Sequence, residues 1–280
     1  MHLAFFSSLD EIADAKGEIF SGLEPGGVAV INSDIAQTDR LIGHARASQA
    51  RVVLFGASER AEARLLDARL HADGSDVDAV IDGERLSYSL RNPGLHVAMN
   101  SLAVLVAAQA VGADLKQAAQ SLSLVPPPSG RGARETLPIE GGAFTLIDES
   151  YNANPASMRA ALDNLGRIAP GAQGRRIAVM GDMLELGVGS ERFHRELAEA
   201  IESNRIDIVL ACGPLMRALW DALPASRRGA YAETSDKLQP AALELLRAGD
   251  VMTIKGSLGS RMGPIVKAIR SRFAAPAAAQ

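Results

Sequence analysis

The stretch FTLIDESYNANPASM, residues 144–158, changes within a few positions from an apolar run to a cluster of polar groups and then to a helix. Its apolar start, Phe144 to Ile147, is typical of the end of a buried strand. Asn154 is suited to be the N-cap of the helix, with Pro155 at the first helical position, where its missing N–H costs nothing. The stretch therefore predicts a strand, a polar turn and a helix N-terminus, which together suit an anionic ligand.

Apolar runs alternate with helical patterns from this stretch to the end of the chain. The predicted strands cover residues 143–148, 176–180, 207–211 and 251–254, with a weaker one near residue 230. The predicted helices lie near 156–168, 190–203, 216–222, 237–248 and 260–273. Such βα units predict a doubly wound, mostly parallel, Rossmann-like α/β domain. Its ligand edge should lie at the strand C-termini, around residues 148–154, 181–186, 213 and 255–257.

The segment PPPSGRG, residues 126–132, breaks any helix and marks a domain boundary upstream of that domain. Arg131 lies within it and Arg134 just after it. A solvated linker arginine is one interpretation of these residues. The other is an arginine anchored at a domain junction, which suits a bound phosphate.

Residues before the boundary predict a second α/β domain. Apolar runs at residues 28–32 and 52–56 indicate buried strands, with a helix near residues 38–49 between them. Residues 57–90 contain weakly alternating pieces that favour antiparallel strands at a sheet edge. A helix is predicted over residues 94–112, with His96 and Asn100 on one face. That face suits a flat ligand such as a nucleobase and suits a neighbouring helix equally well.

A helix is also predicted from Ser8 to Leu23, because Ser8 and Glu11 form a capping-box pattern. Lys16 falls in the middle of its apolar stripe. A lysine in such a stripe either extends its charge to solvent, pairs with a carboxylate or becomes neutral.

Composition narrows the classes of function. The chain has 280 residues, 47% of them hydrophobic and 22% charged, which is typical of a soluble globular protein with room for two cores. Its formal net charge of −4 and the absence of a basic run argue against a nucleic-acid partner. The single cysteine, Cys212, lies in an apolar run and is expected to be an inert core thiol. No signal peptide or membrane-spanning run is seen, so a cytoplasmic protein without membrane insertion is expected.

Several ordered motifs resemble one known family. The runs LIDESYNANPASMRAAL, RRIAVMGDMLELG and IKGS are similar to the C-terminal domain of the Mur ligases that add D-alanyl-D-alanine. HLAFFSSLDEIADAKGEIF and GLHVAMNSLAVLVAA look like the second half of that family's central ATPase domain. The resemblance covers nearly the whole chain. It implies a partial central ATPase domain over residues 1–130 and a Mur ligase C-terminal domain over residues 131–280.

The resemblance also implies roles for individual residues. On the nucleotide side, His2 matches a magnesium ligand, and Lys16 matches a lysine that many Mur ligases carry as a carbamate, a further magnesium ligand. His96 and Asn100 match the adenine region, although Val97 stands where the family commonly has an asparagine. The remaining matches lie near the boundary and in the C-terminal domain: Arg131 for a nucleotide phosphate, Asp148 for the ATP ribose, and Tyr151, Asn152, Asn154 and Lys255 for the substrate cleft.

The activity implied by the resemblance is ATP- and Mg²⁺-dependent ligation in peptidoglycan precursor synthesis. ATP phosphorylates the terminal carboxylate of UDP-N-acetylmuramoyl-tripeptide, and the amine of D-alanyl-D-alanine attacks the acyl phosphate. No G-x-x-x-x-G-K-[ST] motif occurs, since in the family the UDP-binding domain and P-loop precede the position of His2. The chain is therefore expected to be a monomeric C-terminal portion that is inactive alone. The alternatives are another Mur-type amino-acid ligase and a non-catalytic binding protein.

Overall fold

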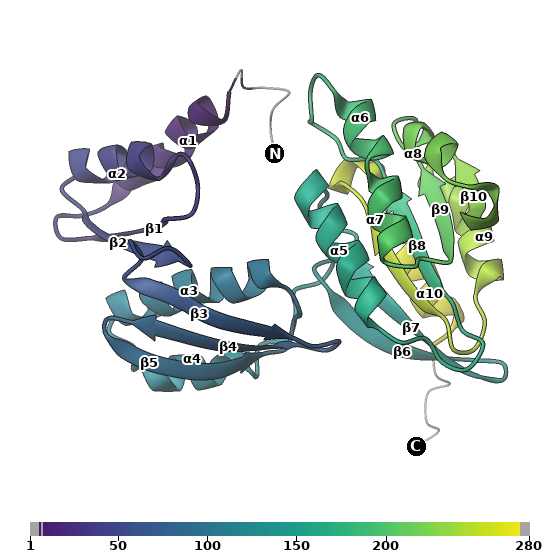
Figure 1. Cartoon of the computed structure of the whole chain (residues 1–280), viewed down its shortest axis with the longest axis horizontal. Coiled ribbons are helices and arrows are strands. Elements are labelled where there is room, and N and C mark those ends of the chain that lie inside the picture. Colours follow the sequence, from purple (N-terminus) through teal and green to yellow (C-terminus); the bar gives the residue numbers. More distant parts are fainter. Residues whose placement is uncertain (1–5, 7, 275–280) are drawn as a thin grey trace. The chain divides into compact units, whose positions relative to one another are not determined.

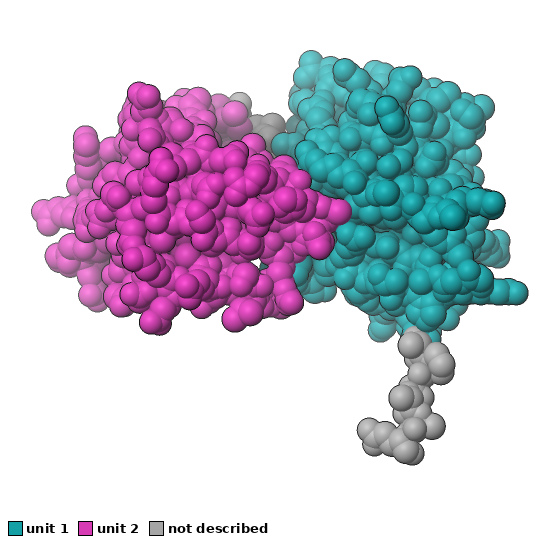
Figure 2. All heavy atoms as spheres, turned by 60° about the horizontal axis from the view of Figure 1, so that its bottom comes forward, with its two compact units in different colours: residues 1, 127–280 teal, residues 2–126 magenta. Residues whose placement is uncertain are grey.

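The structure is a computed structural model that describes Phe6 and residues 8–274 (Figure 1). The chain separates into an N-terminal unit, residues 2–126, and a C-terminal unit, residues 127–280 (Figure 2). This division falls at the start of the proline-rich segment in which the boundary was expected. The domain limits 1–130 and 131–280 stay a prediction.

The N-terminal unit contains a five-stranded mixed sheet. Its strands, in spatial as well as chain order, are β1 (Val28–Asn32), β2 (Arg51–Gly56), β3 (Ala63–Leu70), β4 (Ser75–Ile81) and β5 (Glu84–Leu90). β1, β2 and β3 pair in parallel, whereas β3, β4 and β5 pair antiparallel. The two predicted buried strands and the antiparallel edge are therefore confirmed.

Helices cover both faces of this sheet. The larger core lies beneath α3 (Leu95–Ala110) and α4 (Leu115–Leu122), where Leu102 and Leu105 are fully buried against β2 to β5. A smaller core joins β1 to α2 (Thr38–Ala47) through Ile31 and Ala45. α1 (Leu9–Gly17) and the 3₁₀ turn η1 (Glu18–Gly22) pack against α2, so the predicted helix over residues 8–23 ends earlier than expected.

The C-terminal unit contains a six-stranded sheet in the order β10-β9-β8-β11-β7-β6. The strands are β6 (Ala133–Ile139), β7 (Gly142–Glu149), β8 (Arg176–Gly181), β9 (Ile208–Cys212), β10 (Arg228–Ala232) and β11 (Val251–Lys255). Only β6 is antiparallel to its neighbour. Because β11 lies between β7 and β8 although it comes last in the chain, the strand order reverses there. Open α/β sheets bind ligands at such a reversal, outside the carboxyl ends of the strands.

Helices also lie on both faces of the second sheet (Figure 1). α5 (Pro155–Arg167), α6 (Ser190–Arg195), α7 (Leu197–Ser203) and α8 (Arg217–Ala222) cover one face. α9 (Ser235–Leu245) and α10 (Gly263–Arg272) cover the other, where Met252 and Ile254 of β11 are buried beside Leu238 and Ile265. The 3₁₀ turns η2 (Ala225–Arg227) and η3 (Leu258–Ser260) complete the unit. The predicted doubly wound, mostly parallel fold is confirmed. Within the described residues, we find no helix with the length and apolar character needed to span a bilayer.

Candidate functional site

The turn between β7 and α5 has the predicted strand–turn–helix form. Asn154 is the N-cap of α5, and its Oδ1 accepts from the Ser157 backbone N–H at 2.9 Å. Ser157 Oγ accepts from the Asn154 backbone N–H at 3.0 Å, which completes a capping box, and Pro155 follows the cap. The Asn154 side chain therefore shapes the turn, and the substrate contact expected of it stays a prediction.

Asp148 lies at the end of β7 but faces inward. It is 2% exposed, and its Oδ1 accepts from the backbone N–H and the hydroxyl of Ser150 at 3.2 and 2.6 Å. Arg270 of α10 donates to Asp148 Oδ2 at 3.2 Å and also to Glu135 of β6. In this arrangement the carboxylate holds the turn to α10. The predicted contact with the ATP ribose would require this carboxylate to be uncovered, and it stays a prediction.

Lys255 ends β11 and is 3% exposed. Its Nζ donates to the Asn152 carbonyl oxygen at 2.8 Å and lies 3.3 Å from Glu149 Oε2. Burial lowers the pKa of Lys255, and the negative charge of Glu149 opposes that effect. Because one ammonium contacts both the end of β7 and the backbone of the turn, Lys255 fastens the turn to β11.

The proline-rich segment is attached to the same turn. The Tyr151 N–H donates to the Gly130 carbonyl at 3.2 Å, and the Gly132 N–H donates to the Asp148 carbonyl at 2.8 Å. The Arg131 guanidinium lies 4.5 Å from the centre of the Tyr151 ring, a cation–π contact. Gly130 has φ +73°, and a Cβ there would lie 2.8 Å from Tyr151 Cβ, so this close approach requires glycine. Movement of the segment is therefore coupled to the position of Tyr151.

A cavity of about 520 Å³ lies at the carboxyl ends of β8, β9 and β10. Its wall contains charged groups of both signs: Asp182, Glu233, Asp236 and Arg261. Pockets with a few convergent polar groups at this end of an open α/β sheet are typical ligand sites. The cavity belongs wholly to the C-terminal unit.

Asp182 shapes one side of this cavity. It is 4% exposed, and its carboxylate accepts from the Met216 N–H at 2.8 Å and the Leu215 N–H at 3.4 Å. Burial raises the pKa of Asp182, and these hydrogen bonds oppose that effect. Gly213 has φ +110°, and a Cβ on it would lie 2.4 Å from the carboxylate. Asp182 therefore holds the loop that leads into α8.

His194 supports the loop after β8 from within the core. It is fully buried, and its Nε2 lies 2.9 Å from the Met183 backbone nitrogen, which can only donate. The ring must therefore be neutral and carry its proton on Nδ1, which donates to the Ser190 carbonyl at 2.7 Å. Burial lowers the pKa of His194, which agrees with this neutral form.

Cys212 is 2% exposed at the end of β9. Burial raises the pKa of its thiol to about 11. Since the thiolate is the reactive form, this thiol is inert near neutral pH, as the sequence predicted.

Of the two predicted magnesium ligands, His2 and Lys16, the structure describes only Lys16. His2 lies outside the described residues. Lys16 is exposed, which agrees with the interpretation that its charge extends to solvent, and Ile19 of the apolar stripe is 74% exposed. The carbamate role of Lys16 stays a prediction. The buried face of this helix instead contains Ala13 and Gly17. The His44 ring packs so close to Gly17 that a Cβ there would lie 2.6 Å from it. The described residues contain no group of three or more His, Cys, Asp or Glu arranged for a metal, and magnesium stays a prediction.

His96 and Asn100 lie four residues apart on the first turns of α3, so they share one face as their spacing predicted, and both are exposed. Gly94, with φ +134°, precedes the helix, and a Cβ on it would lie 2.8 Å from the His96 ring. The face is therefore open to a ligand in the N-terminal unit.

Comparison with known proteins gives this geometry a context. The family model described as "Mur ligase middle domain" matches residues 1–108, and the one described as "Mur ligase, glutamate ligase domain" matches residues 135–258. The chain belongs to the Mur ligase family. The expected resemblance is thereby confirmed for both halves of the chain.

Individual Mur ligases are similar along nearly the whole chain. The UDP-N-acetylmuramoyl-tripeptide–D-alanyl-D-alanine ligase of Escherichia coli is 32% identical and covers 96% of this chain, and that of Bacillus subtilis is 30% identical and covers 95%. A crystal structure of MurF from Acinetobacter baumannii matches 97% of the chain with a TM-score of 0.81 at 24% identity. MurF from Thermotoga maritima in complex with ADP gives a TM-score of 0.75 at 21% identity. These two structures are similar in fold.

The chain spans a little over half the length of these Mur ligases. It covers 58% of the Escherichia coli enzyme, 56% of the Bacillus subtilis enzyme and 58% of the Acinetobacter baumannii chain.

The C-terminal Mur ligase unit brings together most of the predicted site residues. Around the β7–α5 turn, Arg131 lies over the Tyr151 ring and the Tyr151 N–H donates to the Gly130 carbonyl. Lys255 donates to the Asn152 carbonyl of the same turn. Sequence reasoning did not single out the partners that hold this turn, Glu149 and Arg270. Asp182 lies within residues 181–186, which were expected at the ligand edge, but its own role in the wall of the cavity was not predicted.

Proposed function

We propose that this chain acts in an ATP-dependent Mur ligase that adds D-alanyl-D-alanine to UDP-N-acetylmuramoyl-tripeptide during peptidoglycan precursor synthesis. The single observation that carries the proposal is the SYNANP turn, which Lys255 fastens at the carboxyl edge of β7 and β11. The Escherichia coli and Bacillus subtilis relatives, which are similar over nearly the whole chain, carry that activity in their names.

In this proposal ATP transfers its γ-phosphoryl group to the terminal carboxylate of the tripeptide, and ADP leaves. The free amine of D-alanyl-D-alanine then attacks the acyl phosphate, and inorganic phosphate departs from the tetrahedral intermediate. Negative charge builds up on the phosphoryl and acyl oxygens, so cationic groups should surround them. Mg²⁺, when bound, would supply part of that charge.

The described residues support the proposal through positioning. Arg131 is exposed beside the turn, where a guanidinium can pair with a phosphate. Lys255 is buried and keeps the turn in place rather than reaching into solvent. Tyr151 is 47% exposed and offers an apolar face beside Arg131. His96 and Asn100 supply the adenine side of the proposed nucleotide site. We further propose a cytoplasmic, monomeric protein.

A binding experiment tests this proposal without depending on turnover. D-alanyl-D-alanine and ADP are titrated separately into ¹⁵N-labelled chain, and amide resonances are followed. ADP is expected to shift the resonances of His96, Asn100 or Arg131. D-alanyl-D-alanine is expected to shift residues of the C-terminal unit more strongly than L-lysine or D-glutamate does. Equal shifts with all three amines would favour another amino-acid ligase, and no shift with ADP would contradict the proposal.

A further inference from the structure

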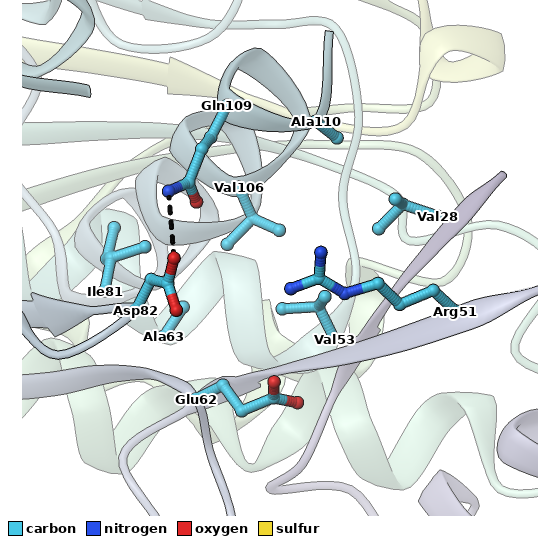
Figure 3. Close-up of a pocket in the computed structure, with 10 residues that line it drawn as sticks. All are labelled: Val28, Arg51, Val53, Glu62, Ala63, Ile81, Asp82, Val106, Gln109 and Ala110. Carbon is cyan, nitrogen blue, oxygen red and sulfur yellow. Dashed lines mark hydrogen bonds between the residues drawn. The ribbon is translucent and has the colours of Figure 1, made fainter. Parts of the chain in front are cut away.

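A small cavity lies in the N-terminal unit where β1 and β2 begin, beside the end of α3 (Figure 3). Its volume is about 140 Å³, equivalent to about five water molecules at roughly 30 Å³ each. Val28, Val53 and Val106 contribute to an apolar wall. The cavity is therefore large enough for a small organic molecule and has an apolar surface to contact one.

Three charged side chains face this cavity: Arg51, Glu62 and Asp82. Figure 3 shows the Arg51 side chain extending across the cavity, with Asp82 beyond its guanidinium and Glu62 below it in that view. Among the described residues, the guanidinium of Arg51 has neither an ion pair within 4.0 Å nor a hydrogen bond. A guanidinium with five donors thus has no protein acceptor.

The two carboxylates, like Arg51, are exposed to solvent and make only long hydrogen bonds within the protein. Asp82 Oδ2 accepts from Gln109 Nε2 at 3.5 Å, and Glu62 Oε1 accepts from the Leu54 N–H at 3.4 Å. Both distances exceed the usual range for N–H···O bonds, roughly 2.7–3.2 Å. Charges of both signs therefore face one small space without pairing with each other.

We propose that this cavity binds a small α-amino acid as its zwitterion. The carboxylate of the ligand pairs with Arg51, whose planar guanidinium matches carboxylate geometry. The ammonium lies between Asp82 and Glu62, and a short side chain contacts Val53 and Val106. A ligand with only one of the two charges would leave the opposite protein charge to solvent alone. The zwitterion satisfies both, which is why we favour it over a simple anion or cation.

This site is separate from the proposed nucleotide site. His96 and Gln109 are thirteen residues apart on α3, which corresponds to about 20 Å at roughly 1.5 Å per residue. The inference does not depend on the proposed ligase activity. Binding here can succeed or fail whatever the nucleotide titration shows.

The test is an NMR titration of the whole ¹⁵N-labelled chain with glycine, L-alanine and D-alanine. Saturable shifts are expected at the amides of Arg51, Asp82 and Gln109, with a dissociation constant on the order of 1 mM. Acetate and methylammonium, which carry one charge each, should bind at least about tenfold more weakly. Equal binding of acetate, or no saturable shift up to on the order of 100 mM, would overturn the proposal.

Two variants and a control sharpen the test. Arg51→Gln and Asp82→Asn should each weaken amino-acid binding about tenfold or more, because each removes one partner charge. Arg46→Gln changes an exposed arginine of the same unit that does not line the cavity, and it should leave binding unchanged. Asp82 lies in an exposed turn, so its variant keeps the test available if Arg51→Gln does not fold. Binding that survives Asp82→Asn would contradict the assigned site.

Discussion

Replacing His194 with phenylalanine should destabilise the C-terminal unit while keeping a buried aromatic ring in place. The change removes the acceptor of the Met183 N–H and the donor to the Ser190 carbonyl. The unsatisfied Met183 N–H costs about 1–3 kcal/mol and the lost hydrogen bond to the Ser190 carbonyl about 1 kcal/mol, so the expected loss is about 2–4 kcal/mol. For a unit of this size each kcal/mol lowers Tm by roughly 2–4 °C, giving a total of about 4–16 °C.

The single tryptophan provides a selective assay. Trp220 lies on α8 in the C-terminal unit and packs beside Tyr231 at 5.9 Å between ring centroids. Its fluorescence in a urea titration therefore reports the unfolding of this unit alone. His71→Phe, a change at a half-exposed histidine of the other unit, is the matched control and should leave that transition unchanged. An His194→Phe transition at the wild-type urea concentration would refute the reasoning.

The same histidine predicts a pH dependence. Because folding lowers the pKa of His194, the unfolded chain binds a proton more readily than the folded chain does. The stability that the neutral ring contributes is thus fully present above the unfolded pKa of about 6.5 and is lost as pH falls through the folded pKa. The destabilisation on acidification should be smaller in His194→Phe. Parallel pH profiles for wild type and variant would contradict this assignment.

Three further substitutions test the ligand edge by the same fluorescence measurement. Asn154→Ala should cost about 1 kcal/mol because it removes the N-cap of α5, and Asn154→Ser should restore most of it. Gly213→Ala should cost about 1–3 kcal/mol, because its φ is unfavourable for alanine and its Cβ would meet Asp182. Gly263→Ala in the same unit is the control, because a Cβ there would make only an ordinary contact, 3.7 Å from Ser150 Oγ. Asp148→Ala should cost about 1–3 kcal/mol, because Ser150 loses its acceptor, whereas Arg270 keeps its pair with Glu135. Unchanged stability with weakened ADP binding would instead favour the ribose contact.

The strands and helices of the C-terminal unit could be predicted because their apolar runs are continuous. β6 could not, because ARETLPI has three polar residues in succession, contains Pro138 and is half-exposed at the sheet edge. α4 was missed because eight residues are few for a periodic pattern, although Asp114 was a readable N-cap.

Those parts of the site that are formed by residues close together in the sequence could be predicted. The strand-to-helix turn follows from local signals, since Asn154 and Ser157 cap each other. The burial of Asp148 does not, because its partner Arg270 is 122 residues away in the chain. The buried face of α1 was not predictable for a related reason: the large apolar residues are partly exposed, whereas the small Gly17 allows the close contact with His44.

The position of β11 also determines when this protein can fold during its synthesis. β7 and β8 leave the ribosome first, but the strand that joins them is made about 70 residues after β8 ends, several seconds later at roughly 5–20 residues per second. Until then, each of the two earlier strands has an edge without its final partner, and such edges favour pairing with other chains. A ribosome that stalls before Val251 would therefore release a chain with two aggregation-prone edges. A stop codon that removes only the residues after Phe273 would leave the whole sheet able to form.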